Sequence, residues 1–213
     1  MSAAPHPPHS RPRRRRAVWA LGALLLVAAI GGYVVRVGRP PLPPALATVY
    51  PIPRDLPPFV LVDQAGARFD RGSLAGHYTL LFLGFTQCPD VCPATLATLA
   101  AAYRAMPASG RPAVVMVSVD PAHDTPAALA AFVPRFDPAF VGAVGDAAAL
   151  QPLAAALGAY YAPGSADGAT RVQHSGAVFL IDPRSAVAAV YTTLPAPAAL
   201  AADVARLTGT GGI

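Results

Sequence analysis

Apolar residues recur along this chain with two periods, and these predict strands and helices in alternation. Residues 79–85 and 114–119 are almost unbroken apolar runs, which is typical of strands buried on both faces. Leu96, Leu99 and Tyr103 recur at helical spacing and predict a helix over residues 94–106. Further strands are expected at residues 59–62, 67–69, 141–144, 177–182 and 187–191, and further helices at 126–133, 146–157 and 198–207. The expected fold class is α/β, with a central mixed sheet flanked by helices.

Two of these helices carry recognisable start or stop signals. Thr125 is a favoured N-cap, and Pro126 suits the first helical position because a proline has no backbone N–H to leave unpaired there. Asp146 is a favoured N-cap for the next helix, and Gly158 is typical of the residue just past a helix end.

Residues 17–35 contain no charged side chain and are long enough to cross a bilayer as a helix. Five arginines precede this stretch and two follow it, so the positive-inside bias predicts a cytoplasmic N-terminus. We expect a single-pass protein of a bacterial inner membrane, with its C-terminal domain in the periplasm. A signal peptide cleaved near the small-x-small residues 45–47, and a mitochondrial inner membrane, are the alternatives.

The composition divides the chain into four parts. We expect a disordered basic tail at residues 1–16, a transmembrane helix at 17–35, a proline-rich linker at 36–55 and a globular domain at 56–213. The formal net charge is +5, but seven of the 16 basic residues lie within the first 39 positions. The remainder has nine arginines and eleven aspartates, so it carries a slight negative charge. This balance argues against nucleic-acid binding.

The candidate chemistry lies between the first buried strand and the helix that follows it. Cys88 and Cys92 are the two cysteines of the chain, and they are four residues apart at this junction. A helix N-terminus favours thiolate over thiol, and cysteines four residues apart on a helix are close enough for a disulfide or for one shared metal ion. A purely structural disulfide is the simplest alternative in an exported domain.

A third candidate ligand is His174, which precedes the strand expected at residues 177–182. Two cysteines cannot by themselves make a four-thiolate zinc or iron–sulfur site. Two thiolates with one imidazole suit a thiophilic ion, above all copper(I). From the residues alone, His174 could equally be an ordinary surface histidine.

Three motifs, GFTQCPDVCPATL, VSVDPAHDTPAAL and HSGAVFLIDP, together resemble the SCO/SenC family over residues 53–208. The resemblance implies a thioredoxin-like domain behind a membrane anchor. It also implies a copper-binding metallochaperone that assists assembly of the CuA centre of cytochrome c oxidase, with oxidase subunit II as the expected partner. By the same resemblance Cys88, Cys92 and His174 would hold the copper ion, Cu(I) or Cu(II). The copper donor and the thiol reductant stay unknown.

The chain departs from the family pattern at two positions. His123 stands where the family usually has Arg, and Gln173 where it often has Asp or Asn. The first departure puts in doubt a charge pairing within the loop, which also contains Asp120 and Asp124. The second puts in doubt a hydrogen bond beside the third ligand. A cap or turn role is expected for these two aspartates and for Asp90, with a carboxylate ligand for copper(II) as the alternative.

An enzyme-like role is the main alternative function. Cys88 and Cys92 could act as a thiol–disulfide reductase on the cysteines of a partner protein. Whether the protein is an enzyme is therefore open, with metallochaperone preferred. Peroxide reduction is weaker, because Thr86 lies two positions before Cys88, where the peroxiredoxin pattern needs three.

Overall fold

The computed structural model describes residues 22, 24–28, 45–159, 161–162, 173–174 and 176–209. Residues 22 and 24–28 are helical, and residues 45–213 form a separate compact unit. The predicted tail at residues 1–16 lies outside the described residues, as does most of the predicted transmembrane helix at 17–35. Among the helices described, none combines the length and the apolar character that crossing a membrane requires.

The domain contains a mixed sheet of eight strands in the order β1-β10-β9-β4-β5-β6-β2-β3. Three central strands are parallel: β4 (Thr79–Gly84), β5 (Ala113–Ser118) and β6 (Val141–Val144). The flanking strands are antiparallel to their neighbours. They are β1 (Thr48–Asp55), β2 (Val60–Asp63), β3 (Arg68–Asp70), β9 (Val178–Ile181) and β10 (Ala186–Tyr191). A two-stranded sheet pairs β7 (Tyr161–Ala162) with β8 (Gln173–His174).

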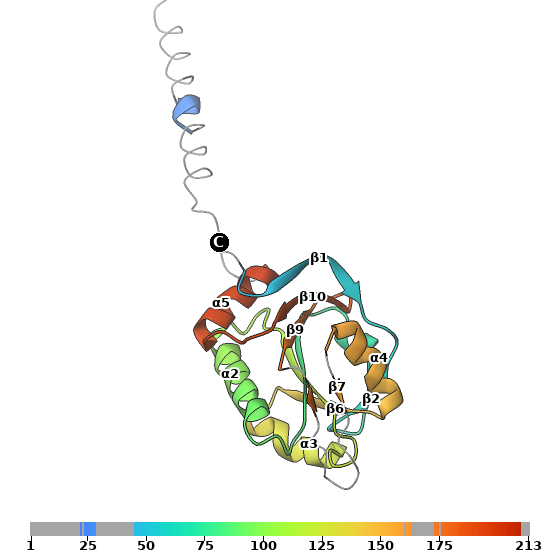
Figure 1. Ribbon diagram of the computed structural model, residues 1–213. Helices are drawn as coiled ribbons and strands as arrows, with labels where there is room; N and C mark the ends of the chain where they lie inside the picture. Colours follow the sequence, from blue (N-terminus) through green and yellow to red (C-terminus); the bar gives the residue numbers. More distant parts are fainter. Residues whose placement is uncertain are drawn as a thin grey trace, which may run out of the picture. The chain divides into compact units, whose positions relative to one another are not determined.

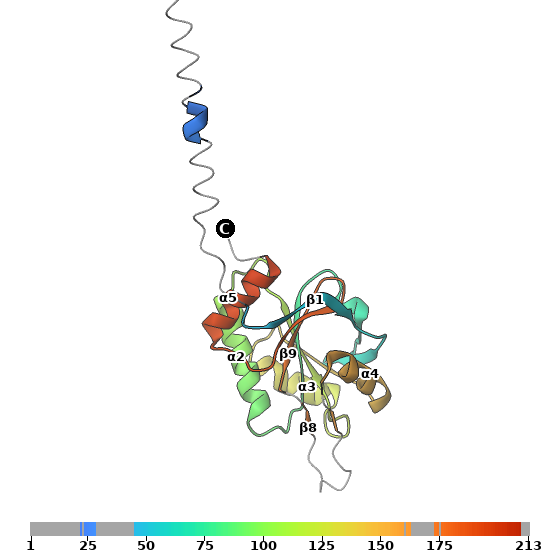
Figure 2. The ribbon, with the colours of Figure 1, turned by 45° about the horizontal axis from the view of Figure 1, so that its top comes forward.

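Helices cover both faces of the large sheet (Figure 1). One face packs against α2 (Val91–Ala105), α3 (Pro126–Phe132) and α5 (Pro197–Thr208). The opposite face packs against α4 (Ala147–Leu157) and the 3-10 helix η1 (Arg71–Leu74). A second 3-10 helix, η2 (Val133–Arg135), follows α3 on the first face. Figure 2 keeps α2 and α5 side by side after the turn of view. The predicted α/β architecture is confirmed.

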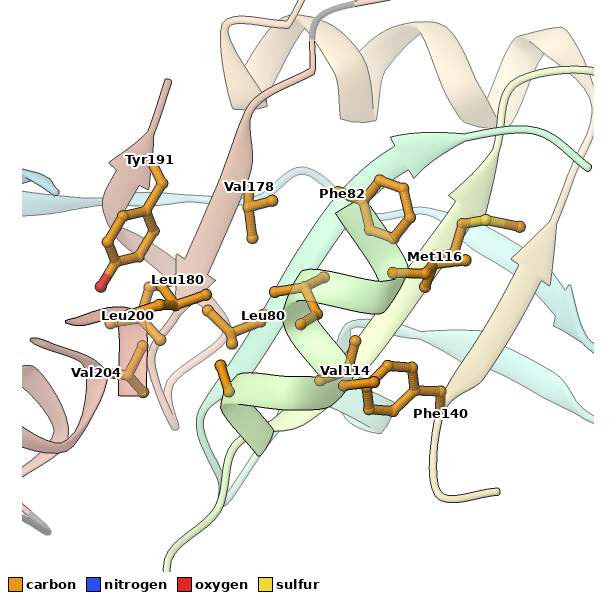
Figure 3. Packing of buried hydrophobic residues seen from close by; sticks show 14 of the residues in the cluster. Leu80, Phe82, Val114, Met116, Phe140, Val178, Leu180, Tyr191, Leu200 and Val204 are labelled. Carbon is orange, nitrogen blue, oxygen red and sulfur yellow. The ribbon is translucent and has the colours of Figure 1, made fainter. Parts of the chain in front are cut away.

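The central strands are buried because their side chains alternate between two apolar cores. Leu80 and Phe82 of β4 enter the core beside α2 and α5, while Leu81 and Leu83 enter the core beside α4. Figure 3 shows Leu80 and Phe82 in the first core, with Met116 of β5 beside the phenylalanine ring. Both faces of β4 are thus apolar, as its uninterrupted sequence predicted.

The cap signals are confirmed, but the proline-rich segment differs from the prediction. Thr125 accepts from the Ala128 amide, Asp146 accepts from the Ala149 amide, and Gly158 ends α4 with a positive φ of 67°. In contrast, residues 48–55 of the predicted linker form β1 at the edge of the sheet. Prolines are compatible with an edge strand because its outer N–H groups need no partner.

Candidate metal and thiol site

The two cysteines lie where β4 ends and α2 begins, and only one of them is helical. Cys92 is the second residue of α2, whereas Cys88 belongs to the loop before it. The junction predicted for the two cysteines is confirmed, with Cys92 already inside the helix. Pro93 occupies the first turn, and the helix starts at Val91 instead of residue 94.

The two sulfurs differ in exposure and in hydrogen bonding. Cys92 is 1% exposed, while Cys88 is only partly buried. The Cys92 backbone N–H donates to Cys88 Sγ over 3.4 Å. Asp90, at the N-cap position, makes no side-chain cap bond, so the sulfur of Cys88 takes over the role of a capping acceptor. The helix N-terminus thus points at Cys88, as anion-binding helix ends do.

Burial raises the pKa of the Cys92 thiol, a hydrogen bond from the Phe85 backbone lowers it, and the neighbouring Cys88 and Asp124 raise it; together they bring this pKa to about 12. The prediction that the helix N-terminus would favour a Cys92 thiolate is therefore wrong for the metal-free protein. Desolvation of the charged sulfur outweighs the helix dipole at this position. A bound cation would reverse that balance, because it neutralises the thiolate in place.

Neither cysteine is joined in a disulfide, so the structural-disulfide alternative is not what the structure shows. A glycine allows the buried sulfur to lie close to the sheet. A Cβ added at Gly84 would lie 3.3 Å from Cys92 Sγ and 2.8 Å from the Phe82 ring. Gly84 therefore permits the close approach of strand and thiol, and composition gave no hint of this role.

The third predicted ligand, His174, is described by its backbone alone. It pairs with Tyr161 in the β7–β8 hairpin. The chain then enters β9, which is antiparallel to β4, so the start of β9 lies beside the end of β4 that leads to the cysteines. A Cβ on Gly176 would lie 3.7 Å from Val91, the neighbour of Cys92. The backbone two residues after His174 thus lies at the same edge of the sheet as the thiols.

Within the described part of the chain, no three side chains of His, Cys, Asp or Glu come together as a metal-binding group. The side chain of His174 lies outside what is described. The metal set Cys88, Cys92 and His174 therefore stays a prediction. Two adjacent sulfurs, one partly exposed, provide the soft donors that copper(I) prefers.

The loop after β5 lies next to the cysteine loop. Asp124 is 1% exposed and accepts hydrogen bonds from Thr86 and from Ser118. Asp120 pairs with His123, whose Nδ1 lies 2.8 Å from the carboxylate. A hydrogen bond between Asp120 and His123 therefore stands where the His-for-Arg departure put a charge pairing in doubt. Sequence reasoning missed the contact between Asp124 and Thr86, because nothing local marks a pair 38 positions apart.

Comparisons with known proteins bear on the family of the chain. The SCO1/SenC family model matches residues 53–209. A Stutzerimonas stutzeri protein whose name proposes copper binding is 37% identical over 142 residues, which are 64% of this chain and 70% of that protein. The bovine mitochondrial SCO2 homologue is 35% identical over 130 residues. These residues are 59% of this chain and 49% of that relative.

A solved structure shows the same fold. The crystal structure of Arabidopsis thaliana ScoI with copper bound matches with a TM-score of 0.67 and 29% identity, over 72% of this chain and 98% of that one. The likeness supports the thioredoxin-like fold that the resemblance implied. The domain, with its Cys88–Cys92 pair at the end of a central strand, belongs to the SCO1/SenC family.

Proposed function

We propose that this protein is a copper metallochaperone that assists assembly of the CuA centre of cytochrome c oxidase. The observation that carries the proposal is the pair of adjacent sulfurs, Cys88 partly exposed and Cys92 buried, in a chain of the SCO1/SenC family. The copper named for the Stutzerimonas relative and bound in the Arabidopsis structure supports the choice of ion. Oxidase subunit II is the proposed recipient, from the family resemblance.

The proposed ligands are Cys88, Cys92 and His174. Copper(I) would displace the thiol protons, so binding would release protons to solvent. The partial exposure of Cys88 would give an incoming ligand access to this sulfur, and exchange to the recipient would begin there. We also propose that a helix at residues 17–35 anchors the protein in a bacterial inner membrane and that the domain acts in the periplasm.

The test is copper binding by the reduced protein. Wild type should retain one copper(I) per chain against a chelator of known affinity. Cys88→Ser and Cys92→Ser should abolish tight retention, and His174→Ala should weaken it by more than the ~10–100-fold that loss of a group behind a ligand costs, if the imidazole is itself a ligand. His77→Ala, at an exposed histidine after η1, is the matched control and should bind as wild type. Full retention by Cys88→Ser or His174→Ala would refute the three-ligand site.

A second function is favoured by the asymmetry of the two thiols. Cys88 could attack a partner disulfide, form a mixed disulfide and release one partner thiolate. Cys92 would then attack Cys88, release the second partner thiol and leave an oxidised Cys88–Cys92 pair, which a thiol reductant must reduce again. A Cys92→Ser variant should then trap a covalent partner without copper, and His174→Ala should leave that trapping unchanged.

A further inference from the structure

A buried carboxylate connects the loop after β5 to the cysteine loop. Asp124 accepts from the Thr86 amide over 3.0 Å, from the Thr86 hydroxyl, and from the Ser118 hydroxyl over 2.6 Å. Ser118 is the last residue of β5 and is fully buried. Thr86 lies only two positions before Cys88. One carboxylate thus bridges the end of a rigid strand and the segment that carries the exposed thiol.

The backbone contacts around this bridge show what the carboxylate adds. The cysteine loop is attached to the neighbouring chain where the loop begins: the Val119 amide, just after β5, donates to the Gly84 carbonyl over 2.9 Å. The Cys88 amide donates to the Phe85 carbonyl over 3.4 Å, so Cys88 belongs to one short turn with Thr86. Fixing Thr86 therefore fixes the turn from which the Cys88 side chain leaves the backbone.

The free energy of burial makes this contact a strong one. A carboxylate removed from water is costly unless donors replace the lost hydration. Asp124 receives two of its three donors from Thr86. Displacing the cysteine loop would therefore leave the buried carboxylate poorly solvated. The loop is held in place by the same carboxylate that it solvates.

We propose that Asp124 is a positioning residue for the sulfur site: through Thr86 it sets where Cys88 Sγ lies relative to Cys92. The part of the inference that concerns copper rests on the function proposed above. The part that concerns the geometry of the thiol pair does not, because the same positioning also governs disulfide formation between Cys88 and Cys92.

The test compares Asp124→Asn with wild type in two assays. The variant has nearly the same volume, but its amide group cannot accept from all three donors. Copper(I) affinity, measured by competition with a chelator, should fall by about 10–100-fold, as for other groups that orient metal ligands. The thiol–disulfide equilibrium with glutathione should shift as well; there the two thiols give two electrons and two protons to glutathione disulfide, which becomes two glutathione molecules.

Asp203→Asn is the matched control, because Asp203 is also buried and also accepts several hydrogen bonds, from residues of β10, of α5 and of the segment before β1. It should lower stability but leave both sulfur assays unchanged. Thr86→Val keeps the backbone donor and removes only the hydroxyl, so it should give a smaller loss. If Asp124 acts through Thr86, the double variant should lose less than the sum of the single losses.

The outcomes separate this inference from the proposed function. If wild type binds no copper, the metallochaperone proposal fails and the glutathione equilibrium alone decides the role of Asp124. If Asp124→Asn matches wild type in both assays, or if Asp203→Asn changes them equally, the positioning role is refuted. If Asp124→Asn does not fold, Thr86→Val decides: a value equal to wild type in both assays overturns the inference.

Discussion

At the scale of single residues, the packing around the buried sulfur of Cys92 determines both its position and its pKa. Gly84 leaves room that any side chain would fill, with Cys92 Sγ and Met116 Sδ both 3.3 Å from the place of its missing Cβ. Burial is the main cause that raises the pKa of the Cys92 thiol to about 12. The sulfur site therefore depends on how closely the Cys92 side chain packs against Gly84 of β4 in the core.

Gly84→Ala should weaken copper(I) binding and lower stability together. The new methyl group would lie 2.8 Å from the Phe82 ring, so the core must shift, at a cost of about 1–3 kcal/mol. Cys92 Sγ would have to move with it. Chelator competition and urea unfolding measure the two effects. Gly142→Ala, which meets Val133 at 2.9 Å beside α3, should lower stability alone, and equal copper affinities for both variants would contradict this account.

At the scale of elements, β1 shows how proline content and strand structure coexist. It is the outermost strand next to β10, and its register shifts between Val49 and Arg54. Pro51 and Pro53 lie within that shift, and Ile52 between them is 83% exposed. Irregular pairing and missing N–H groups protect a sheet edge against pairing with another chain.

Replacing both prolines by threonine, Pro51→Thr with Pro53→Thr, should increase self-association of the protein. The change supplies two N–H donors and a β-branched side chain at each position beside an exposed isoleucine. Sedimentation velocity over a range of concentrations measures the effect. Pro58→Thr changes an exposed proline outside β1 and should not associate. A variant that stays as monomeric as wild type would show that the prolines do not protect this edge.

The same strand marks the limit of what the sequence predicts. Strands such as β4 and β5 are evident from their apolar runs, and α3 and α4 from their caps, because those signals are local. The strand β1 was missed, because its prolines read as a linker and its pairing with β10 joins distant parts of the chain. The start of α2 was placed too late, since its capping acceptor is a sulfur. Likewise, the motif identifies Cys88 and Cys92, but the Asp124 bridge depends on tertiary contact.

At the scale of the whole molecule, Asp203 joins the two ends of the domain. Its carboxylate accepts from the Leu46 and Ala47 amides, from the Tyr191 hydroxyl and from Arg206. Burial tends to raise the pKa of Asp203, but Arg206 and the other donors outweigh burial and hold that pKa below its usual value. The segment before β1 is thus fastened to α5 by one ionised group.

Asp203→Asn should lower the free energy of unfolding at neutral pH by about 1–3 kcal/mol, the cost of buried donors that lose their acceptor. Because the folded pKa is lowered, the carboxylate contributes stability above its unfolded pKa of about 3.9, and this contribution is lost as the pH falls through the folded value. Urea unfolding of wild type and Asp203→Asn, from neutral pH into acid, should show that the difference between their free energies of unfolding becomes smaller as the pH falls. A difference independent of pH would contradict the assignment to ionised Asp203.

The cap formed by the sulfur of Cys88 links the chemical state of this thiol to the stability of the first turn of α2. Since the Cys92 amide donates to that sulfur, alkylating or oxidising Cys88 changes the position and the accepting strength of the atom that caps the first turn of α2. Amide hydrogen exchange in this turn should therefore accelerate whenever the sulfur is chemically engaged elsewhere. The chemical state of the Cys88 thiol would thus be readable as fraying of the first turn of α2.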